Sequence, residues 1–340
     1  MKHVPAVLLI LSAGLAASPA RAHHSNAQFD MDRTISIEGV VAEYTWANPH
    51  VYITIVETMD AGDETAWEVE GPPPAFLRRQ GWSRDMLALG QSVVVVGSPS
   101  RDQTVHSLVM SSLERAEVSL FDQASGMGAL MNPGEVSAVA AAGLDGVWTT
   151  VLSPSVIPLI AETNQLGLTE AGAAALARFD ERSMNPGVDC IAHPAPLMMT
   201  APDVKRIVTG DDVIRIAGEF DDAERIVFLN VDSHASARPS VQGYSIGRWQ
   251  GDTLIIETAR FAEHGQGNFL VPASSEKRLV ERLTLDEGGR TLTYQFELAD
   301  PVILSQPLSG EVRWVFSPDL AFEPAPCELS NARRFLDRRP

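Results

Sequence analysis

Residues 277–298 read KRLVERLTLDEGGRTLTYQFEL, and their pattern decides the fold class. Apolar and polar residues alternate along the two arms, KRLVERLTL and TLTYQFEL, as they do in strands with one buried face. The arms are separated by DEGGR, which carries the aspartate and the glycines typical of a hairpin turn. This stretch therefore predicts two antiparallel strands joined by a short turn.

The same short-strand pattern repeats through the C-terminal part of the chain. Apolar and β-branched segments are separated by turn signals such as QGD, and the helices that a parallel sheet needs as crossovers are not indicated between them. Residues 144–340 therefore predict a larger antiparallel, lipocalin-like barrel or curved open sheet. One surface helix is expected within GLTEAGAAALARFDERS, residues 167–183, with Thr169 as its N-cap.

The N-terminal part predicts a second, smaller β unit. Its expected elements are a short helix within residues 72–90 and strands at 34–46, 50–59, 65–71, 92–99 and 106–118. Three strands, a helix and two strands is the order of an OB-type barrel, which we expect over residues 23–118. Residues 119–143, rich in Gly, Ala, Ser and Met, predict a flexible linker. The whole chain is thus expected to be mainly β.

The first residues have the three parts of a secretory signal. A short positive start is followed by an apolar run from Val4 to Leu15 and by the small-residue site Ala20-Arg21-Ala22. We expect residues 1–22 to be a signal peptide that is cleaved after Ala22, and the protein to be periplasmic or secreted. No later stretch approaches the roughly 20 apolar residues of a spanning helix, so no membrane span is expected.

The charge balance argues against a nucleic-acid partner. The chain carries 26 basic and 44 acidic side chains, a formal charge of -18, without a visible basic patch. Such a chain repels a phosphate backbone. The two cysteines, Cys190 and Cys327, lie far apart in the sequence. In an oxidising compartment they are expected to pair in one disulfide, the alternative being two free thiols.

Residues 23 to about 117 resemble the uncharacterised exported family DUF6152. The resemblance is carried by HHS at 23–25, FD at 29–30, WANPH at 46–50 and LRRQGWSRDMLALG at 77–90. It implies a small exported β domain and no established activity.

The C-terminal half resembles an uncharacterised family of exported bacterial proteins, through MMTAP at 198–202, RIVFLN at 225–230 and GYSIGRWQGDTLIIET at 243–258. In addition, Gly146-Val147-Trp148 with Arg313 on a late strand is similar to the lipocalin G-x-W motif and its packing arginine. Neither resemblance implies an activity. The similarity to the lipocalin motif agrees with the barrel prediction.

Cleavage after Ala22 would make His23 the mature N-terminus, which predicts a metal site. The α-amine and the imidazole of one residue form a chelate ring, and a second imidazole completes a three-nitrogen set of the histidine-brace kind. Nitrogen ligands in a flat arrangement favour copper among the transition metals. His50 is the expected third ligand because Pro49 stiffens the turn before it, whereas the adjacent His24 would point away.

Other residues around this site have weaker roles. Asp30 and Glu43 are expected as outer acceptors for a ring N–H, and His106 is a more distant candidate ligand on the fifth strand. The alternative is that HHS only flanks the cleavage site and that His50 is a turn histidine whose ring bonds a backbone carbonyl.

Residues 243–247, GYSIG, fit the G-x-S-x-G pattern of hydrolase nucleophiles. The pattern makes Ser245 a candidate nucleophile, with Asp252 and His264 following in hydrolase order. However, the nucleophile elbow needs a helix after the serine, and here a turn and a strand follow. The alternative is that Gly243 and Gly247 permit a bulge where strands approach closely.

Several residues are expected around a ligand pocket in the larger barrel. His193 and His234 lie in loops at its mouth, Arg248 is expected to stack on Trp249, and Glu281 is expected to pair with Arg248 across strands. Leu197-Met198-Met199 is expected to plug the core. The pocket candidates together are Trp148, His193, His234, Arg248, Trp249 and Glu281.

The sequence thus predicts an exported binding protein. It is expected to hold copper or another transition metal through His23 and His50, and a small apolar or aromatic ligand in the barrel. The first alternative is a metal-free ligand carrier or interaction module, and the second is a serine hydrolase that uses Ser245. Whether the protein is an enzyme stays open at this level.

Overall fold

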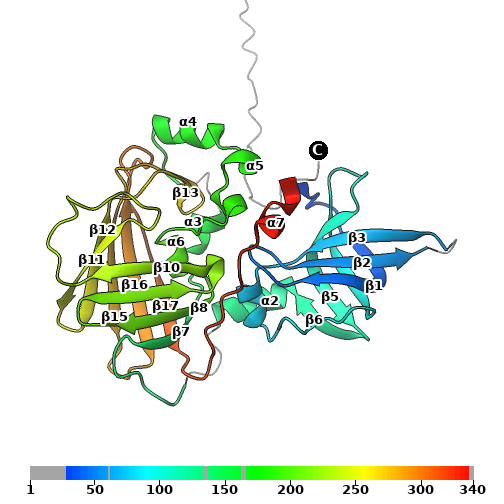
Figure 1. Cartoon of the computed structure of the whole chain (residues 1–340), viewed down its shortest axis with the longest axis horizontal. Coiled ribbons are helices and arrows are strands. Elements are labelled where there is room, and N and C mark those ends of the chain that lie inside the picture. The colour runs from blue at the N-terminus through cyan, green and yellow to red at the C-terminus, as the bar shows by residue number, and fades with distance from the viewer. Residues whose placement is uncertain (1–27, 60–61, 133–136, 162–165, 337–340) are drawn as a thin grey trace, which may run out of the picture.

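The computed structural model describes residues 28–59, 62–132, 137–161 and 166–336, and it consists mainly of two β-barrels. The smaller barrel lies on the right of Figure 1 and the larger one on the left, with the C-terminal tail running between them. Among the described residues, no helix is both long enough and apolar enough to cross a membrane.

The smaller barrel has the predicted order of elements. These elements are β1 (Ile35–Thr45), β2 (Tyr52–Thr58), β3 (Glu64–Glu70), α1 (Pro74–Arg78), β4 (Ser92–Pro99) and β5 (Ser107–Arg115). The sheet runs β3-β2-β1-β4-β5, and a parallel pairing of β3 with β5 closes it. The OB-like prediction is confirmed by this order and closure. The alternation along each strand places one row of apolar side chains in a common core.

The predicted linker over residues 119–143 is wrong in its first half. β6 (Val118–Asp122) pairs with β5, and α2 (Gln123–Met131) follows directly. The Asp122 side chain accepts a hydrogen bond from the Ser125 backbone N–H at 2.8 Å and so caps α2. β6 has too few residues to show a clear alternation, and its pairing partner on β5 is not evident from the local sequence.

The larger barrel closes with nine strands. They are β7 (Gly146–Val151), β8 (Val204–Thr209), β9 (Val213–Gly218), β10 (Ala223–Phe228), β11 (Tyr244–Gln250), β12 (Thr253–Ala259), β15 (Arg278–Leu285), β16 (Thr291–Ala299) and β17 (Leu308–Phe316). The hairpin predicted from residues 277–298 is confirmed as β15–β16, with Leu285 opposite Leu292.

One pairing in this barrel departs from the predicted antiparallel arrangement. β10 and β11 are parallel, with Val227 level with Ser245. Parallel neighbours need a long crossover, and residues 229–243 supply it without forming a helix. The barrel prediction therefore holds, but the chain does not simply turn back at every strand.

Short helices cover the upper end of the larger barrel in Figure 1. They are α3 (Ile157–Ala161), α4 (Glu170–Arg178), α5 (Glu181–Met184) and α6 (Leu197–Thr200). The predicted helix is confirmed as α4, which is capped by Thr169 through its hydroxyl and the Gly172 N–H at 2.9 Å. The predicted core plug is also confirmed, because Leu197, Met198 and Met199 are all buried. A separate two-stranded ribbon is formed by β13 (His264–Asn268) and β14 (Val271–Ala273).

The two barrels are joined by side-chain contacts and by the C-terminal tail, which a disulfide anchors to the larger domain. Cys190 and Cys327 are bonded, which confirms the predicted pair. From α1, Arg78 donates to the Glu219 carboxylate at 2.5 Å, and Phe76 stacks on Phe220 with ring centroids 5.5 Å apart. In the tail, α7 (Leu329–Ala332) lies between the barrels and is followed by a short 3-10 turn, η5 (Arg334–Leu336).

Candidate functional site

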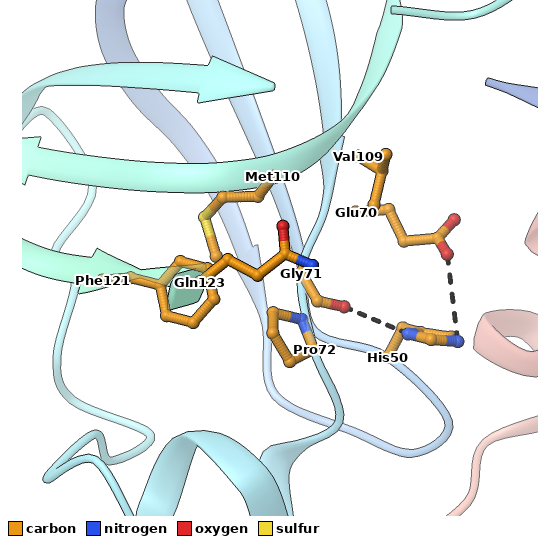
Figure 2. A pocket seen from close by; sticks show the side chains of 8 residues that line it. All are labelled: His50, Glu70, Gly71, Pro72, Val109, Met110, Phe121 and Gln123. Carbon is orange, nitrogen blue, oxygen red and sulfur yellow. Dashed lines mark hydrogen bonds and ion pairs between the residues drawn. The ribbon is translucent and has the colours of Figure 1, made fainter. Parts of the chain in front are cut away.

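A hollow on the smaller barrel brings one predicted ligand, His50, next to a buried carboxylate (Figure 2). The hollow has a volume of about 150 Å³. Its walls come from the turn before β2, the end of β3, β5, β6 and the start of α2. The lining residues are His50, Glu70, Gly71, Pro72, Val109, Met110, Phe121 and Gln123.

The His50 ring is oriented by a backbone carbonyl. Its Nδ1 lies 3.1 Å from the Gly71 carbonyl oxygen, which can only accept a hydrogen bond, so Nδ1 carries the proton and donates it. In the neutral ring Nε2 is then an acceptor with a free lone pair. This Nε2 faces Glu70, with 3.8 Å to its Oε1, and the His50 side chain is 26% exposed. The carbonyl bond that the sequence left as an alternative is therefore present, and it leaves Nε2 available.

Glu70, the last residue of β3, is the functional candidate that the sequence analysis missed. Its side chain is only 2% exposed, and its Oε2 accepts a hydrogen bond from the Tyr52 hydroxyl at 3.2 Å. Burial raises the pKa of the Glu70 carboxyl, while His50 and the Tyr52 hydroxyl act in the opposite direction. A glutamate on the inner side of a strand, directly before a Gly-Pro-Pro-Pro stop, is the sequence signal that marks it.

The N-terminal end of the described chain reaches the same carboxylate. The Gln28 side-chain amide donates to Glu70 Oε2 at 3.5 Å, and the Gln28 carbonyl accepts from the Arg101 N–H at 2.9 Å. Two predicted metal ligands, His23 and His24, lie outside the described residues, as does the expected signal peptide. The chain that leads to them therefore starts beside the His50–Glu70 pair.

The other predicted members of the metal site lie elsewhere. Asp30 pairs with Arg101 at 4.0 Å, and Glu43 pairs with Arg334 at 3.5 Å. His106 is exposed just before β5, with its ring 5.1 Å from that of Trp67. Among the residues that the structure describes, no three His, Cys, Asp or Glu side chains converge on one point. His50 and Glu70 thus form a pair that needs further ligands to hold a metal ion.

The predicted pairing of Glu281 with Arg248 is wrong. Across β11, β12 and β15, Glu281 lies level with Gly247, whereas Arg248 lies level with Arg282. A one-residue offset puts side chains on opposite faces of a sheet. Arg248 consequently points outward and donates to Asp232 at 3.1 Å.

Inside the barrel, the partner of Glu281 is Arg225. The two form a fully buried bidentate pair at 2.7 and 2.9 Å, and the Tyr294 hydroxyl donates to the same carboxylate at 2.8 Å. Burial is the main cause that raises the pKa of Tyr294, so this hydroxyl stays protonated. Arg225 was not singled out from the sequence, because RIVFLN looks like an ordinary strand.

Ser245 belongs to the same interior network. Its hydroxyl receives a hydrogen bond from Arg225 at 2.7 Å and lies 2.9 Å from the Thr258 hydroxyl. It sits within β11 and is followed by more strand, not by the helix of a nucleophile elbow. The predicted close approach is present at Gly247, where a Cβ would lie 2.7 Å from Val227, but β11 pairs with β12 from Tyr244 to Gln250 without the predicted bulge.

The remaining pocket candidates divide between the core and the surface. Trp148 is fully buried, with its ring 5.0 Å from that of Phe316, so it is a core residue and not a pocket wall. Arg313, the expected lipocalin partner of Trp148, is exposed on β17. Trp249 is 51% exposed, and His234 donates to the Glu257 carbonyl at 3.0 Å on the outside.

His193 lies in a polar cluster near the domain boundary. Its Nδ1–H donates to Asp221, its Nε2 lies 3.1 Å from Gln266 Oε1, and its ring stacks on Phe220. The nearby His264 is buried, which lowers its pKa to about 4, with the charge of His193 contributing. These contacts satisfy His193 within the protein and join it to the interface.

One family model matches the N-terminal part of the chain. Residues 10–109 match DUF6152, a family of unknown function, which supports the resemblance seen in the N-terminal part. No curated protein matches the chain.

Two solved structures are similar to about a quarter of the chain. The mitochondrial single-stranded DNA binding protein Rim1 from S. cerevisiae is 16% identical over 25% of this chain and 92% of its own, with a TM-score of 0.20. The Stn1–Ten1 complex from S. pombe is 18% identical over 28% of this chain and 65% of the matched one, also with a TM-score of 0.20. Scores this low support no argument about function.

Proposed function

We propose that this chain is an exported metal-binding protein that holds copper, or another transition metal, at His50 and the mature N-terminal His23. Export and cleavage after Ala22 are part of the proposal, because they free the α-amine of His23. The observation that carries it is the orientation of His50: Nδ1 is held by the Gly71 carbonyl, and Nε2 is directed at Glu70. Metal-binding histidines are held in this way by an acceptor behind the ring.

The gap between His50 and Glu70 suits a cation. At 3.8 Å, Nε2 and Oε1 are too far apart for a hydrogen bond, and the lone pairs of a neutral imidazole and a carboxylate repel each other. A proton on Nε2 or a metal ion between the two groups removes this repulsion. Nitrogen and carboxylate ligands lie roughly 2.0–2.2 Å from a transition metal, so both groups can belong to one coordination sphere.

The N-terminal histidine is within reach of this gap. The Gln28 amide donates to Glu70 Oε2, the carboxylate oxygen that does not face His50. His23 precedes Gln28 by only five positions. An extended stretch of that length spans roughly 17 Å at most, so the amine and ring of His23 can approach Nε2 of His50. Together they would supply the three nitrogens of a histidine brace, with Glu70 as an additional or outer ligand.

A copper titration tests the proposal. The processed protein, with its N-terminus verified by mass, is titrated with Cu(II) against a competing chelator. We expect His50→Ala, or one extra residue ahead of His23, to weaken binding by at least 100-fold, while His106→Ala binds like the wild type. Equal affinity in all four proteins would defeat the proposal.

The small apolar or aromatic ligand predicted from the sequence fits this hollow better than the barrel. The barrel interior is occupied by its own side chains, including Tyr294 stacked on Trp314. The hollow instead presents Val109, Met110 and Phe121 beside His50. A cavity of about 150 Å³ is known to accept benzene. Phenol binding followed by NMR, with and without Cu(II), tests this part, and a metal-free carrier would bind phenol without copper.

The hydrolase alternative stays a prediction. The hydrogen bonds of the Ser245 hydroxyl run to Arg225 and Thr258. If an active-site-directed fluorophosphonate leaves Ser245 unlabelled, the serine-hydrolase alternative is ruled out.

A further inference from the structure

The C-terminal tail of the larger domain reaches the turn that presents His50. After β17 the chain leaves the larger barrel, and α7 lies between the two barrels in Figure 1. Cys327 anchors the tail to Cys190 in a loop of the larger domain. Residues 325–334, here called the strap, therefore connect a loop of the larger domain to the turn that presents His50 in the smaller one.

The first part of the strap is bonded to Asn48. The Asn48 N–H donates to the Pro326 carbonyl at 3.0 Å, and the Asn48 side-chain amide donates to the Ala325 carbonyl at 2.8 Å. A parallel bridge also joins Asn48 to Cys327. Asn48 is itself buried, so these bonds replace water at the start of the turn.

The second part of the strap holds the turn through a single side chain. The Asn331 amide nitrogen lies 3.2 Å from the carbonyl oxygen of Ala47, 3.1 Å from that of Asn48 and 2.9 Å from that of His50. Asn331 is 1% exposed, so the amide gathers three carbonyls from both sides of Pro49 in a dry place. The backbone that carries the His50 ring is thereby fixed from behind.

The end of the strap supports the other half of the pair. The Arg334 guanidinium lies over the Tyr52 ring at 4.8 Å and pairs with Glu68 at 3.3 Å. The Tyr52 hydroxyl donates to Glu70. The strap thus touches the supports of both His50 and Glu70 without touching the gap between them.

We propose that the strap presets the His50 turn for metal binding, with Asn331 as the positioning residue and the Cys190–Cys327 disulfide as the anchor. This inference rests on the proposed function of His50. It means that the metal affinity of the smaller domain depends on the larger one, and that the smaller barrel alone is not the complete binding unit. Residues that orient a metal ligand typically change metal affinity 10- to 100-fold when they are replaced.

The first test compares two asparagine variants of the full processed protein. We expect Asn331→Ala to weaken Cu(II) binding about 10-fold, while Asn230→Ala, an exposed control, binds like the wild type. Affinity is measured well below the melting temperature of each protein, so lower stability alone does not change it. An unchanged affinity in folded Asn331→Ala overturns the proposal. If that variant does not fold, the hydrogen-exchange test below, which leaves Asn331 in place, decides the proposal.

The second test is independent of copper. We expect the double variant C190A/C327A to exchange the Asn48 amide hydrogen at least 10-fold faster, while the Trp82 amide, bonded to Leu77 within the smaller barrel, is unchanged. If the Asn48 amide hydrogen exchanges at the same rate in the double variant and in the wild type, the proposed role of the strap is overturned, whatever the copper result. If the wild type binds no Cu(II) but Asn48 responds as expected, the proposed function fails and the structural role of the strap stands.

Discussion

Two buried carboxylates in this protein have opposite surroundings. Glu281 accepts hydrogen bonds from both terminal nitrogens of the Arg225 guanidinium, so a full positive charge offsets the desolvation of the carboxylate. Glu70 instead faces the ring of His50 at 3.8 Å and accepts a hydrogen bond from Tyr52. Burial consequently raises the pKa of Glu70. Buried acids of this kind, next to a histidine in a hollow, are characteristic of functional sites.

Replacing Glu70 by Gln is expected to stabilise the apo protein and to weaken metal binding. A carboxyl whose pKa is higher in the folded than in the unfolded state contributes stability below its unfolded pKa, and this contribution is lost as pH rises through the folded pKa. At pH 7 the variant should therefore be more stable by about 1 kcal/mol, a typical gain for a stabilising substitution. Denaturant unfolding at pH 4 and pH 7 checks this. A variant less stable than the wild type at pH 7 would contradict it.

Removing Glu281 is expected to be far more damaging than removing Arg248. Glu281→Ala leaves the buried Arg225 without its counter-charge, which costs about 3–5 kcal/mol. Arg248→Ala only removes an exposed pair with Asp232, worth about 0–1 kcal/mol. Equilibrium urea unfolding of both variants measures the difference. Similar losses in the two would mean that the interior pair is not as described.

At the level of elements, glycines allow the smaller barrel to close. The pairing of β4 with β5 shifts its register between Val96 and Gly97. A Cβ on Gly97 would lie 2.2 Å from the Val109 carbonyl oxygen, on the strand that also lines the hollow. The bulge at this position therefore depends on the missing side chain.

Gly97→Ala is expected to destabilise the protein by about 1–3 kcal/mol, the usual cost of forcing atoms into a packed site. Gly128→Ala is the matched control, because it lies in α2 with open space around its Cβ position. In a helix this change should stabilise by roughly 0.5–1 kcal/mol. Thermal unfolding should show a lower melting temperature for Gly97→Ala and a higher one for Gly128→Ala than for the wild type. Equal shifts in melting temperature would contradict the close approach at Gly97.

At the scale of the whole molecule, the two barrels are coupled by a polar interface and by the C-terminal tail, which the Cys190–Cys327 disulfide anchors to the larger domain. Arg79, the residue directly after α1, donates to the carbonyl of Thr150 at 2.8 Å and to that of Pro202 at 3.2 Å, beside the Arg78–Glu219 pair. Burial is the main reason that the pKa of Arg79 falls to about 10. These contacts place Arg78 and Arg79 at the domain boundary and not at the hollow.

We expect the wild type to unfold in one calorimetric transition. The triple variant C190A/C327A/R78A should show two transitions, because it loses both the anchor of the tail that bonds to the smaller barrel and the ion pair between the domains. Differential scanning calorimetry at one pH and one scan rate checks this. Two transitions in the wild type would show that the domains are already independent.

The parts of the fold that depend on local patterns were predictable. The hairpin of residues 277–298, the order of elements in the smaller barrel, the Thr169 cap and the Leu197–Met199 plug are confirmed. Each follows from alternation, capping or apolar runs within a few residues. The same patterns did not predict the pairing of β6 with β5 or the parallel pairing of β10 with β11. The local sequence of a strand does not identify the strand with which it pairs.

The sequence by itself determined the two β units, the disulfide partners and His50 as a ring presented by a proline turn. Only the tertiary structure decided that Glu70 faces His50, that Arg225 and not Arg248 pairs with Glu281, and that Asn331 holds the His50 turn from 281 positions away. The physical reason is that propensity and periodicity act between neighbours along the chain. Contacts across a barrel depend on strand register and closure, which are settled only when the whole chain packs.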